Sequence, residues 1–142
     1  MKPIILSAIL LFANLPAWAD SYGSFKGVIF HGCYDGDTCT FTIPGVHPLL
    51  GDKIKVRLRG IDAAEIRSKC DWAKKHAIRT RDFLIALLRG SPRVDLVDVE
   101  RGKYFRIIAT VIAHGVDIGE VLIEKGWARP YEGGKREAWC SE

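Results

Sequence analysis

The sequence has no long apolar run after its first nineteen residues, and it has no internal repeat, low-complexity block or extended linker. A membrane-spanning helix needs roughly 20 consecutive apolar residues, so we expect no span in the remainder of the chain. Removing the first nineteen of the 142 residues leaves residues 20–142. This length suits one compact domain with a single core, because domains usually contain roughly 100–200 residues.

Contiguous basic residues are also scarce. The formal net charge is +4, and it falls to +3 without the first nineteen residues because Lys2 is their only charged residue. The positive charge is therefore spread out, unlike the basic blocks of tails that coat nucleic acid without specificity. A mild basic excess suits a polyanionic partner but does not identify one.

The spacings of a zinc site are missing as well. The chain has no Cys-x-x-Cys pair and no two histidines separated by three to five residues, which disfavours zinc binding. Its four histidines are scattered and have no neighbouring nucleophile pattern, so we interpret them as structural or surface residues: His31, His47, His76 and His114.

The first nineteen residues have the pattern of an export signal. Lys2 supplies a basic start, residues 4–13 are apolar apart from Ser7, and the Ala-Trp-Ala sequence at 17–19 offers a cleavage site. We expect cleavage after Ala19, with an uncleaved anchor as the alternative. The mature protein is then periplasmic or secreted and has no stable association with the membrane.

All four cysteines follow this cleavage site, and an even number of cysteines in an exported chain argues for disulfides. Three pairings are possible. Cys33 and Cys39 flank the Asp-Gly-Asp-Thr sequence at 35–38, so a hairpin turn there brings them together. The expected bridges are therefore Cys33–Cys39 and Cys70–Cys140, with a Cys39–Cys70 link as the alternative. The second expected bridge ties the C-terminal tail to the rest of the domain.

The hydrophobic pattern predicts strands first. Three short runs rich in β-branched and aromatic residues, at 27–31, 39–43 and 53–61, are separated by the turn signals Asp35-Gly36 and Pro44-Gly45. Two further runs, at 93–99 and 104–114, are joined by a polar turn at 100–103. We interpret the first three as a meander.

Two helices complete the pattern. Ser68 is the expected cap of the first, which ends at Gly90 and has one apolar stripe: Ala73, Ala77, Thr80, Leu84 and Leu87. The second helix is expected to start at Asp117, with Glu120 as its capping partner, and to end at Gly126. This order predicts a mainly β, α+β fold, an oligonucleotide-binding (OB-fold) barrel of five strands with two to three helices.

Three short sequences carry residues suited to phosphodiester chemistry. The Asp-Gly-Asp-Thr sequence at 35–38 contains two acids, the 57–65 sequence contains Arg57, Asp62 and Glu65, and the 103–106 sequence ends in Arg106. Each has an ordinary interpretation, namely a hairpin turn, a solvated charged face and a basic strand edge. Together they supply a hard-cation site and a phosphate clamp, which favours function over the separate interpretations.

In these sequences the chain resembles the staphylococcal-nuclease-like, or thermonuclease, family from about Lys26 to about Tyr131. The resemblance implies that Asp37 and Asp62 are Ca²⁺ ligands, that Glu65 activates water, and that Arg57 and Arg106 bind phosphate. It also implies products with a 3′-phosphate. More weakly, it implies substrate contacts at three further positions: Lys103, Tyr104 and Tyr131.

Two positions depart from the family pattern. Ala64 stands where the family usually has proline, so the loop that carries Glu65 is less restrained. Phe105 stands where the family usually has glycine, so the turn before Arg106 is expected to differ in detail, since positive φ costs less for glycine.

The expected function is therefore Ca²⁺-dependent hydrolysis of DNA or RNA. The main alternative is an OB-fold module that binds nucleic acid without cutting it, which retention of Glu65 and Arg106 disfavours. A third alternative, an exported disulfide-rich interaction or inhibitor module, leaves the acid and arginine set unexplained. No feature implies a protein partner, and we expect a monomer.

Overall fold

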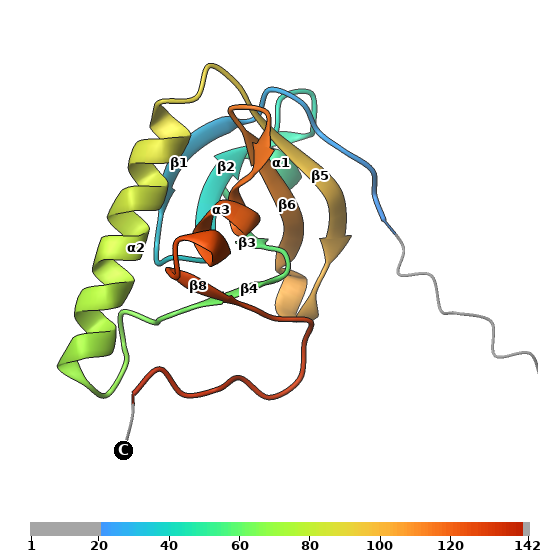
Figure 1. Cartoon of the computed structure of the whole chain (residues 1–142). Coiled ribbons are helices and arrows are strands. Elements are labelled where there is room, and N and C mark those ends of the chain that lie inside the picture. The colour runs from blue at the N-terminus through green and yellow to red at the C-terminus, as the bar shows by residue number, and fades with distance from the viewer. Residues whose placement is uncertain (1–20, 141–142) are drawn as a thin grey trace, which may run out of the picture.

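The protein is described by a computed structural model that covers residues 21–140. The proposed export signal and its cleavage site lie outside these residues. The fold is α+β, with one strongly curled sheet packed against helices (Figure 1). The curled sheet forms a half-barrel of five main strands, which confirms the OB-like fold expected from the order of elements.

The main sheet has the strand order β1-β2-β3-β6-β5, with a short strand β7 added beside β6. The strands are β1 (Ile29–Cys33), β2 (Thr38–Thr42), β3 (Ile54–Leu58), β5 (Val94–Arg101), β6 (Ile107–Ala113) and β7 (Val116–Asp117). All pairs are antiparallel except β3 with β6, which is parallel. A second, two-stranded sheet consists of β4 (Ile61–Ala63) and β8 (Ala128–Pro130).

The expected continuous strand at 53–61 is wrong, because the chain breaks into β3 and β4. Gly60 adopts a φ of 74° between them, and the chain changes sheets there: β3 pairs with β2 and β6, whereas β4 pairs with β8. The break places Arg57 near the end of one strand and Asp62 in the middle of the next.

The long helix α2 (Asp71–Arg89) packs along one side of the sheet (Figure 1). Its buried residues are Ala73, Ala77, Thr80, Leu84 and Leu88. Leu87, which the sequence placed in this stripe, is only partly buried. The helix starts later than expected: Cys70 is the N-cap residue, and the Ser68 amide instead donates to the Glu65 carbonyl oxygen at 3.0 Å.

Two smaller helices flank the sheet. Asp117 caps α3 (Ile118–Glu124) by accepting a hydrogen bond from the Gly119 amide, as its position in the sequence predicts. Helix α1 (Pro48–Gly51) was not expected, and its two leucines remain exposed. No helix within residues 21–140 combines the length and apolarity needed to cross a membrane.

Both expected disulfides are present. Cys33 and Cys39 are directly paired positions of β1 and β2, so their bridge closes the hairpin that carries residues 35–38. Cys70 at the start of α2 is bonded to Cys140, which returns the C-terminal segment to this helix (Figure 1).

Candidate active site

The turn between β1 and β2 places Asp37 inside the protein. The Asp37 amide donates to the Asp35 carboxylate at 3.2 Å, and the Asp37 carbonyl oxygen accepts from the Leu58 amide of β3 at 2.8 Å. Close packing, rather than an unusual backbone dihedral angle, requires a glycine at position 36. A Cβ atom at this position would lie 2.6 Å from Thr80 Cγ2 and 2.8 Å from Ala63 Cβ.

Arg57 joins Asp37 to Asp62. Its Nη1 atom lies 3.2 Å from Asp37 Oδ2, and its Nη2 atom lies 3.8 Å from Asp62 Oδ1 and donates to the Ile61 carbonyl oxygen at 3.1 Å. All three charged side chains are buried. Two carboxylates next to one guanidinium carry a net negative charge, which attracts a further cation.

The neighbouring carboxyl of Asp35 is also buried. Burial raises its pKa from the ordinary value of 3.8 to about 6, and the negative charge of Asp37 acts in the same direction. The turn therefore holds the carboxyl groups of Asp35 and Asp37 close together in a buried position, where burial favours the neutral form of Asp35.

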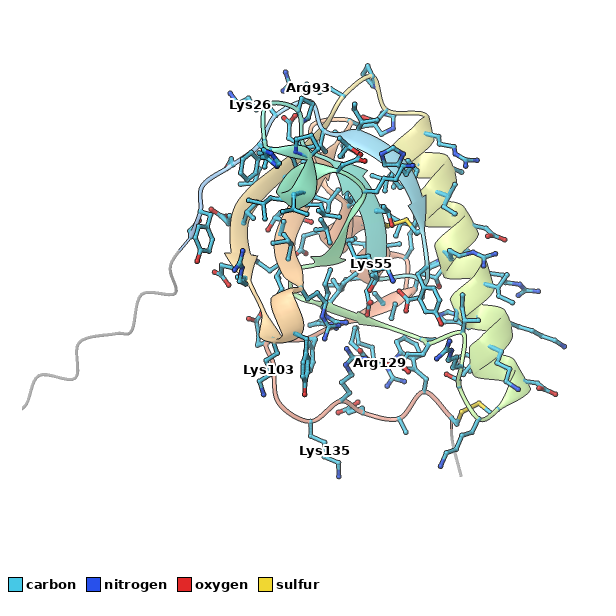
Figure 2. The ribbon with its side chains drawn as sticks, turned by 180° about the vertical axis from the view of Figure 1, so that it is seen from behind. Lys26, Lys55, Arg93, Lys103, Arg129 and Lys135 are labelled. Atoms are coloured by element: carbon cyan, nitrogen blue, oxygen red, sulfur yellow. A yellow bond between two sulfur atoms is a disulfide. The ribbon has the colours of Figure 1, made fainter. Side chains whose placement is uncertain are left out.

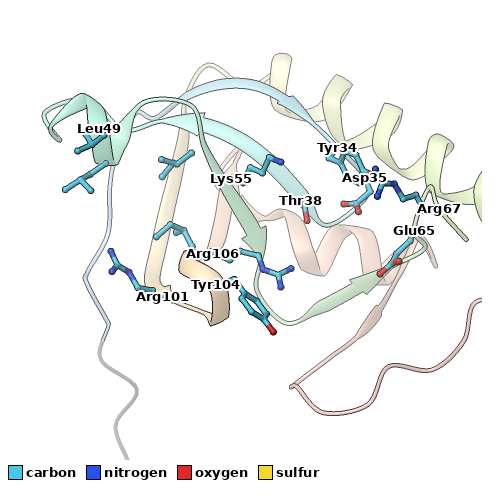
Figure 3. Close-up of a pocket in the computed structure, with 13 residues that line it drawn as sticks. Tyr34, Asp35, Thr38, Leu49, Lys55, Glu65, Arg67, Arg101, Tyr104 and Arg106 are labelled. Carbon is cyan, nitrogen blue, oxygen red and sulfur yellow. The ribbon is translucent and has the colours of Figure 1, made fainter.

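Glu65 lies beyond β4, in the loop that leads to α2, and its side chain is 57% exposed. It lines a groove of about 780 Å³ together with Asp35, Thr38 and Arg106. Figure 3 shows Glu65 reaching into this groove from the loop after β4 and Arg106 reaching into it from the segment before β6. The five expected residues thus form two groups, the buried network of Asp37, Arg57 and Asp62 and the groove pair of Glu65 and Arg106.

The three weaker candidates lie in different places: Tyr104 lines the groove, Lys103 precedes it in the chain, and Tyr131 lies beside Arg57. Lys103 and Tyr104 do not open a strand as expected but belong to a 3₁₀ turn, η1 (Lys103–Phe105). Tyr104 takes the positive φ, 58°, so the strained position is one residue earlier than the Phe105 that the sequence indicated. Tyr131 packs between two arginines, with Arg57 at 5.6 Å and Arg136 at 5.8 Å from its ring centre.

Sequence reasoning missed two residues that contact the acids. Arg136 Nε lies 3.2 Å from Asp62 Oδ1, its Nη1 atom lies 2.6 Å from Glu65 Oε1, and Trp139 Nε1 donates to Asp62 Oδ2 at 3.0 Å. Partial burial acts to lower the pKa of Arg136, but the carboxylates of Asp62, Asp37 and Glu65 raise it above its usual value. One signal for both residues was present in the sequence, because a bridge from Cys70 to Cys140 returns residues close to 140 to the loop before α2.

The carboxylates have the chemistry that Ca²⁺ prefers, since this ion takes six to eight oxygen ligands and accepts backbone carbonyls and waters beside carboxylates. Asp62 Oδ1 is buried and accepts no hydrogen bond, although Arg136 and Arg57 form ion pairs with it at 3.2 and 3.8 Å. Asp37 and Asp62 share a guanidinium, which holds them close together. No group of three or more His, Cys, Asp or Glu side chains within residues 21–140 is arranged to hold a metal by itself. The two acids therefore fit Ca²⁺ only with additional oxygen ligands.

The structure therefore combines a curled half-barrel with acids and arginines at one groove. Comparison with protein-family models matches residues 55–139 to the staphylococcal nuclease homologue family. This match covers more than half of the chain, and the protein belongs to this family. Membership suggests a nuclease with a nucleic-acid substrate, and nucleases of this family typically use Ca²⁺. A search of curated proteins found no match.

Proposed function

We propose that this protein is an exported, Ca²⁺-dependent nuclease that hydrolyses phosphodiester bonds of DNA or RNA and leaves 3′-phosphate ends. The observation that supports this most strongly is the buried network of Asp37, Arg57 and Asp62 beside a groove shared by Glu65 and Arg106. The pair of disulfides fits an exported protein, because such bonds persist in oxidising compartments.

In this proposal Asp37 and Asp62 would hold Ca²⁺, which would act as a Lewis acid and stabilise negative charge on the phosphate. Arg57 keeps the two acids together, and its guanidinium binds phosphate. Arg106 reaches into the groove from the opposite side and offers forked donors to the oxygens that gain charge as the bond breaks.

In this proposal Glu65 is the general base. Its carboxylate is exposed to the groove, so a water molecule between Glu65 and a bound phosphate is able to give up a proton as it attacks phosphorus. The O5′–P bond then breaks, the 5′ oxygen takes up a proton from solvent, and the phosphate stays on the 3′ oxygen. Lys103, Tyr104 and Tyr131 are proposed to contact the nucleic acid on either side.

The surface charge at this end of the barrel supports a polyanionic substrate. Figure 2 shows Lys103, Arg129 and Lys135 at the end where the C-terminal segment crosses the barrel. Positive charge near a groove increases the local concentration of a polyanion and its rate of association, an effect that salt weakens.

The direct test is cleavage of labelled single-stranded DNA and RNA by the purified mature protein, with Ca²⁺ or with a chelator. We expect cleavage only with Ca²⁺. If the products carry 3′-phosphates, the new 5′ ends are free hydroxyls, and a polynucleotide kinase should label them without prior phosphatase treatment. Glu65→Gln should reduce kcat by about 10²–10⁴, with substrate affinity nearly unchanged, because an amide keeps the shape but is not a base.

Glu124→Gln is the matched control, since it makes the same chemical change at the exposed end of α3. A wild-type protein that binds nucleic acid but does not cut it supports a binding-only module instead. A loss below tenfold for Glu65→Gln leads to the same conclusion.

A further inference from the structure

The C-terminal segment of residues 132–140 crosses the candidate active site. It leaves β8, passes beneath β4 and β8, and returns to the first turn of α2 (Figure 1). The disulfide between Cys140 and Cys70 holds its far end. Glu65 is only five residues before Cys70, so the anchor of the segment is close in sequence to the loop that carries Glu65.

Two side chains of this segment hold the acids directly. Arg136 forms ion pairs with Asp62 at 3.2 Å and with Glu65 at 2.6 Å. Trp139 donates a hydrogen bond to the other oxygen of Asp62, and the Arg129 guanidinium stacks on the Trp139 ring at 4.0 Å. The segment is therefore fixed at three points, namely the disulfide, the tryptophan and the arginine.

Glu65 needs such a restraint more than the buried acids do. Asp37 and Asp62 are nearly inaccessible to solvent and are held by backbone and by Arg57, whereas the Glu65 side chain is largely exposed. Ala64 precedes it and restrains the backbone less than proline does. A solvated glutamate samples several rotamers, and a base that must meet a water at one position loses rate when it samples others.

We propose that Arg136 is a positioning residue for Glu65, and that the disulfide-anchored segment 132–140 is part of the working active site. This inference rests on the proposed function. Arg136 holds the Glu65 carboxylate at the edge of the groove through one ion pair and is itself held by a second ion pair to Asp62. The contact of the Arg136 guanidinium with the Tyr131 ring further limits the positions that the guanidinium can take.

The test compares Arg136→Ala, Arg136→Lys and the control Arg89→Ala in the full mature protein at saturating Ca²⁺. Arg89→Ala makes the same chemical change at an exposed position in the last turn of α2, at the other end of this helix from Cys70. We expect Arg136→Ala to lower kcat by on the order of tenfold with KM within about twofold, because the loss affects the reacting geometry and not ground-state binding. Arg136→Lys should recover part of kcat, and Arg89→Ala should equal wild type.

Combination with Glu65→Gln separates positioning from a general structural effect. If Arg136 acts through Glu65, then Arg136→Ala adds no further loss of kcat to Glu65→Gln, since residues that act as a unit are not additive. An additional tenfold loss in the double variant overturns the inference. Unchanged or increased kcat in Arg136→Ala also overturns it, and an increase means that the segment obstructs the groove.

Calorimetric titration of Ca²⁺ supplies a readout that does not depend on turnover. Removing a positive charge beside Asp62 should leave the Ca²⁺ Kd equal to or lower than that of wild type. A Kd raised more than about threefold means that Arg136 maintains the metal site as a whole, and this result also overturns the inference. If the wild-type protein cleaves nothing, the proposed function fails and the inference fails with it. If the wild-type protein cleaves and Arg136→Ala has an unchanged kcat, only the inference is rejected.

A second variant tests the role of Arg136 by removing the disulfide that anchors the segment. Cys70→Ser with Cys140→Ser releases the segment and should lower kcat to a similar extent, with no added effect of Arg136→Ala. Circular dichroism at the assay temperature verifies that the barrel is folded. Wild-type kcat in the folded, bridge-free protein contradicts the role of the anchored segment.

Discussion

Arg57→Met tests how far the buried acids depend on one shared guanidinium. Methionine has a similar length and no charge, so the substitution leaves two buried carboxylates without their common partner. It also removes the donor to the Ile61 carbonyl oxygen. Removing one partner of a buried ion pair typically costs about 3–5 kcal/mol, because the remaining charge stays desolvated.

We therefore expect the free energy of unfolding in chelator to fall by about 3–5 kcal/mol. This is a large part of the roughly 5–15 kcal/mol that stabilises a typical domain. The melting temperature should fall by roughly 10 °C or more, since about 1 kcal/mol corresponds to several degrees in a domain of this size. Urea denaturation followed by circular dichroism measures the change.

Two further variants identify the cause. Arg59→Met removes a neighbouring arginine whose ion pair with Glu100 is partly exposed, so it should cost no more than about 1 kcal/mol. Asp37→Asn introduced into Arg57→Met should recover part of the lost stability, because it removes one of the uncompensated charges. A loss below about 1 kcal/mol for Arg57→Met refutes the argument.

Calcium ions should partly replace the missing guanidinium. A ligand that binds only the folded state stabilises it by RT ln(1 + [L]/Kd), which is about 2.7 kcal/mol at one hundred times Kd. Because Arg57→Met leaves more negative charge for the ion, saturating Ca²⁺ should raise the stability of the variant more than that of wild type. Equal gains in the two proteins contradict a metal site at these acids.

Three other changes have definite expected outcomes. Gly36→Ala should destabilise the protein by about 1–3 kcal/mol in urea denaturation, because the added methyl group meets Thr80 and overpacks the turn; an unchanged midpoint contradicts this. Asp35→Asn in chelator should stabilise the protein by roughly 1–2 kcal/mol near pH 8 and by almost nothing near pH 3 to 4. The folded-state pKa of about 6 lies above the unfolded value, so stability is lost as pH rises through about 6, and partial solvation reduces the effect. A gain at low pH rejects this explanation. Cys70→Ser with Cys140→Ser should lower the free energy of unfolding by about 4 kcal/mol, since the bridge closes a loop of 70 residues. Thermal unfolding of the wild-type protein with and without reductant checks this prediction, and identical unfolding curves under the two conditions reject it.

Local patterns in the sequence predicted the elements whose stability depends on local contacts. The cysteines at 33 and 39 flank a turn sequence, and the structure pairs the two residues directly across the hairpin. The apolar stripe of α2 and the Asp117 cap of α3 were also predicted, because helix periodicity and capping involve residues close in sequence.

Features that depend on distant partners were not predicted. The 53–61 run alternates like a single strand, yet it divides because residues 61–63 pair with β8, which lies more than sixty residues later. Arg136 shows the same limit at the site. Its type and local sequence resemble those of any surface arginine. The expected Cys70–Cys140 bridge indicates that the tail returns to the loop before α2, but it does not indicate which tail residue contacts Asp62 and Glu65.

The parallel pairing of β3 with β6 has a consequence for biosynthesis. Arg57 pairs with Ile108, and the separation of 51 residues (108 − 57) means that a large loop must close before the strands meet. Pairings between distant strands form slowly compared with helices and hairpins. An N-terminal fragment that ends with β5, at Arg101, lacks Arg106, and it lacks the strand β6 that pairs with β3. A growing chain therefore remains without a complete groove until β6 has been made, because both Arg106 and the partner of β3 come this late in the sequence.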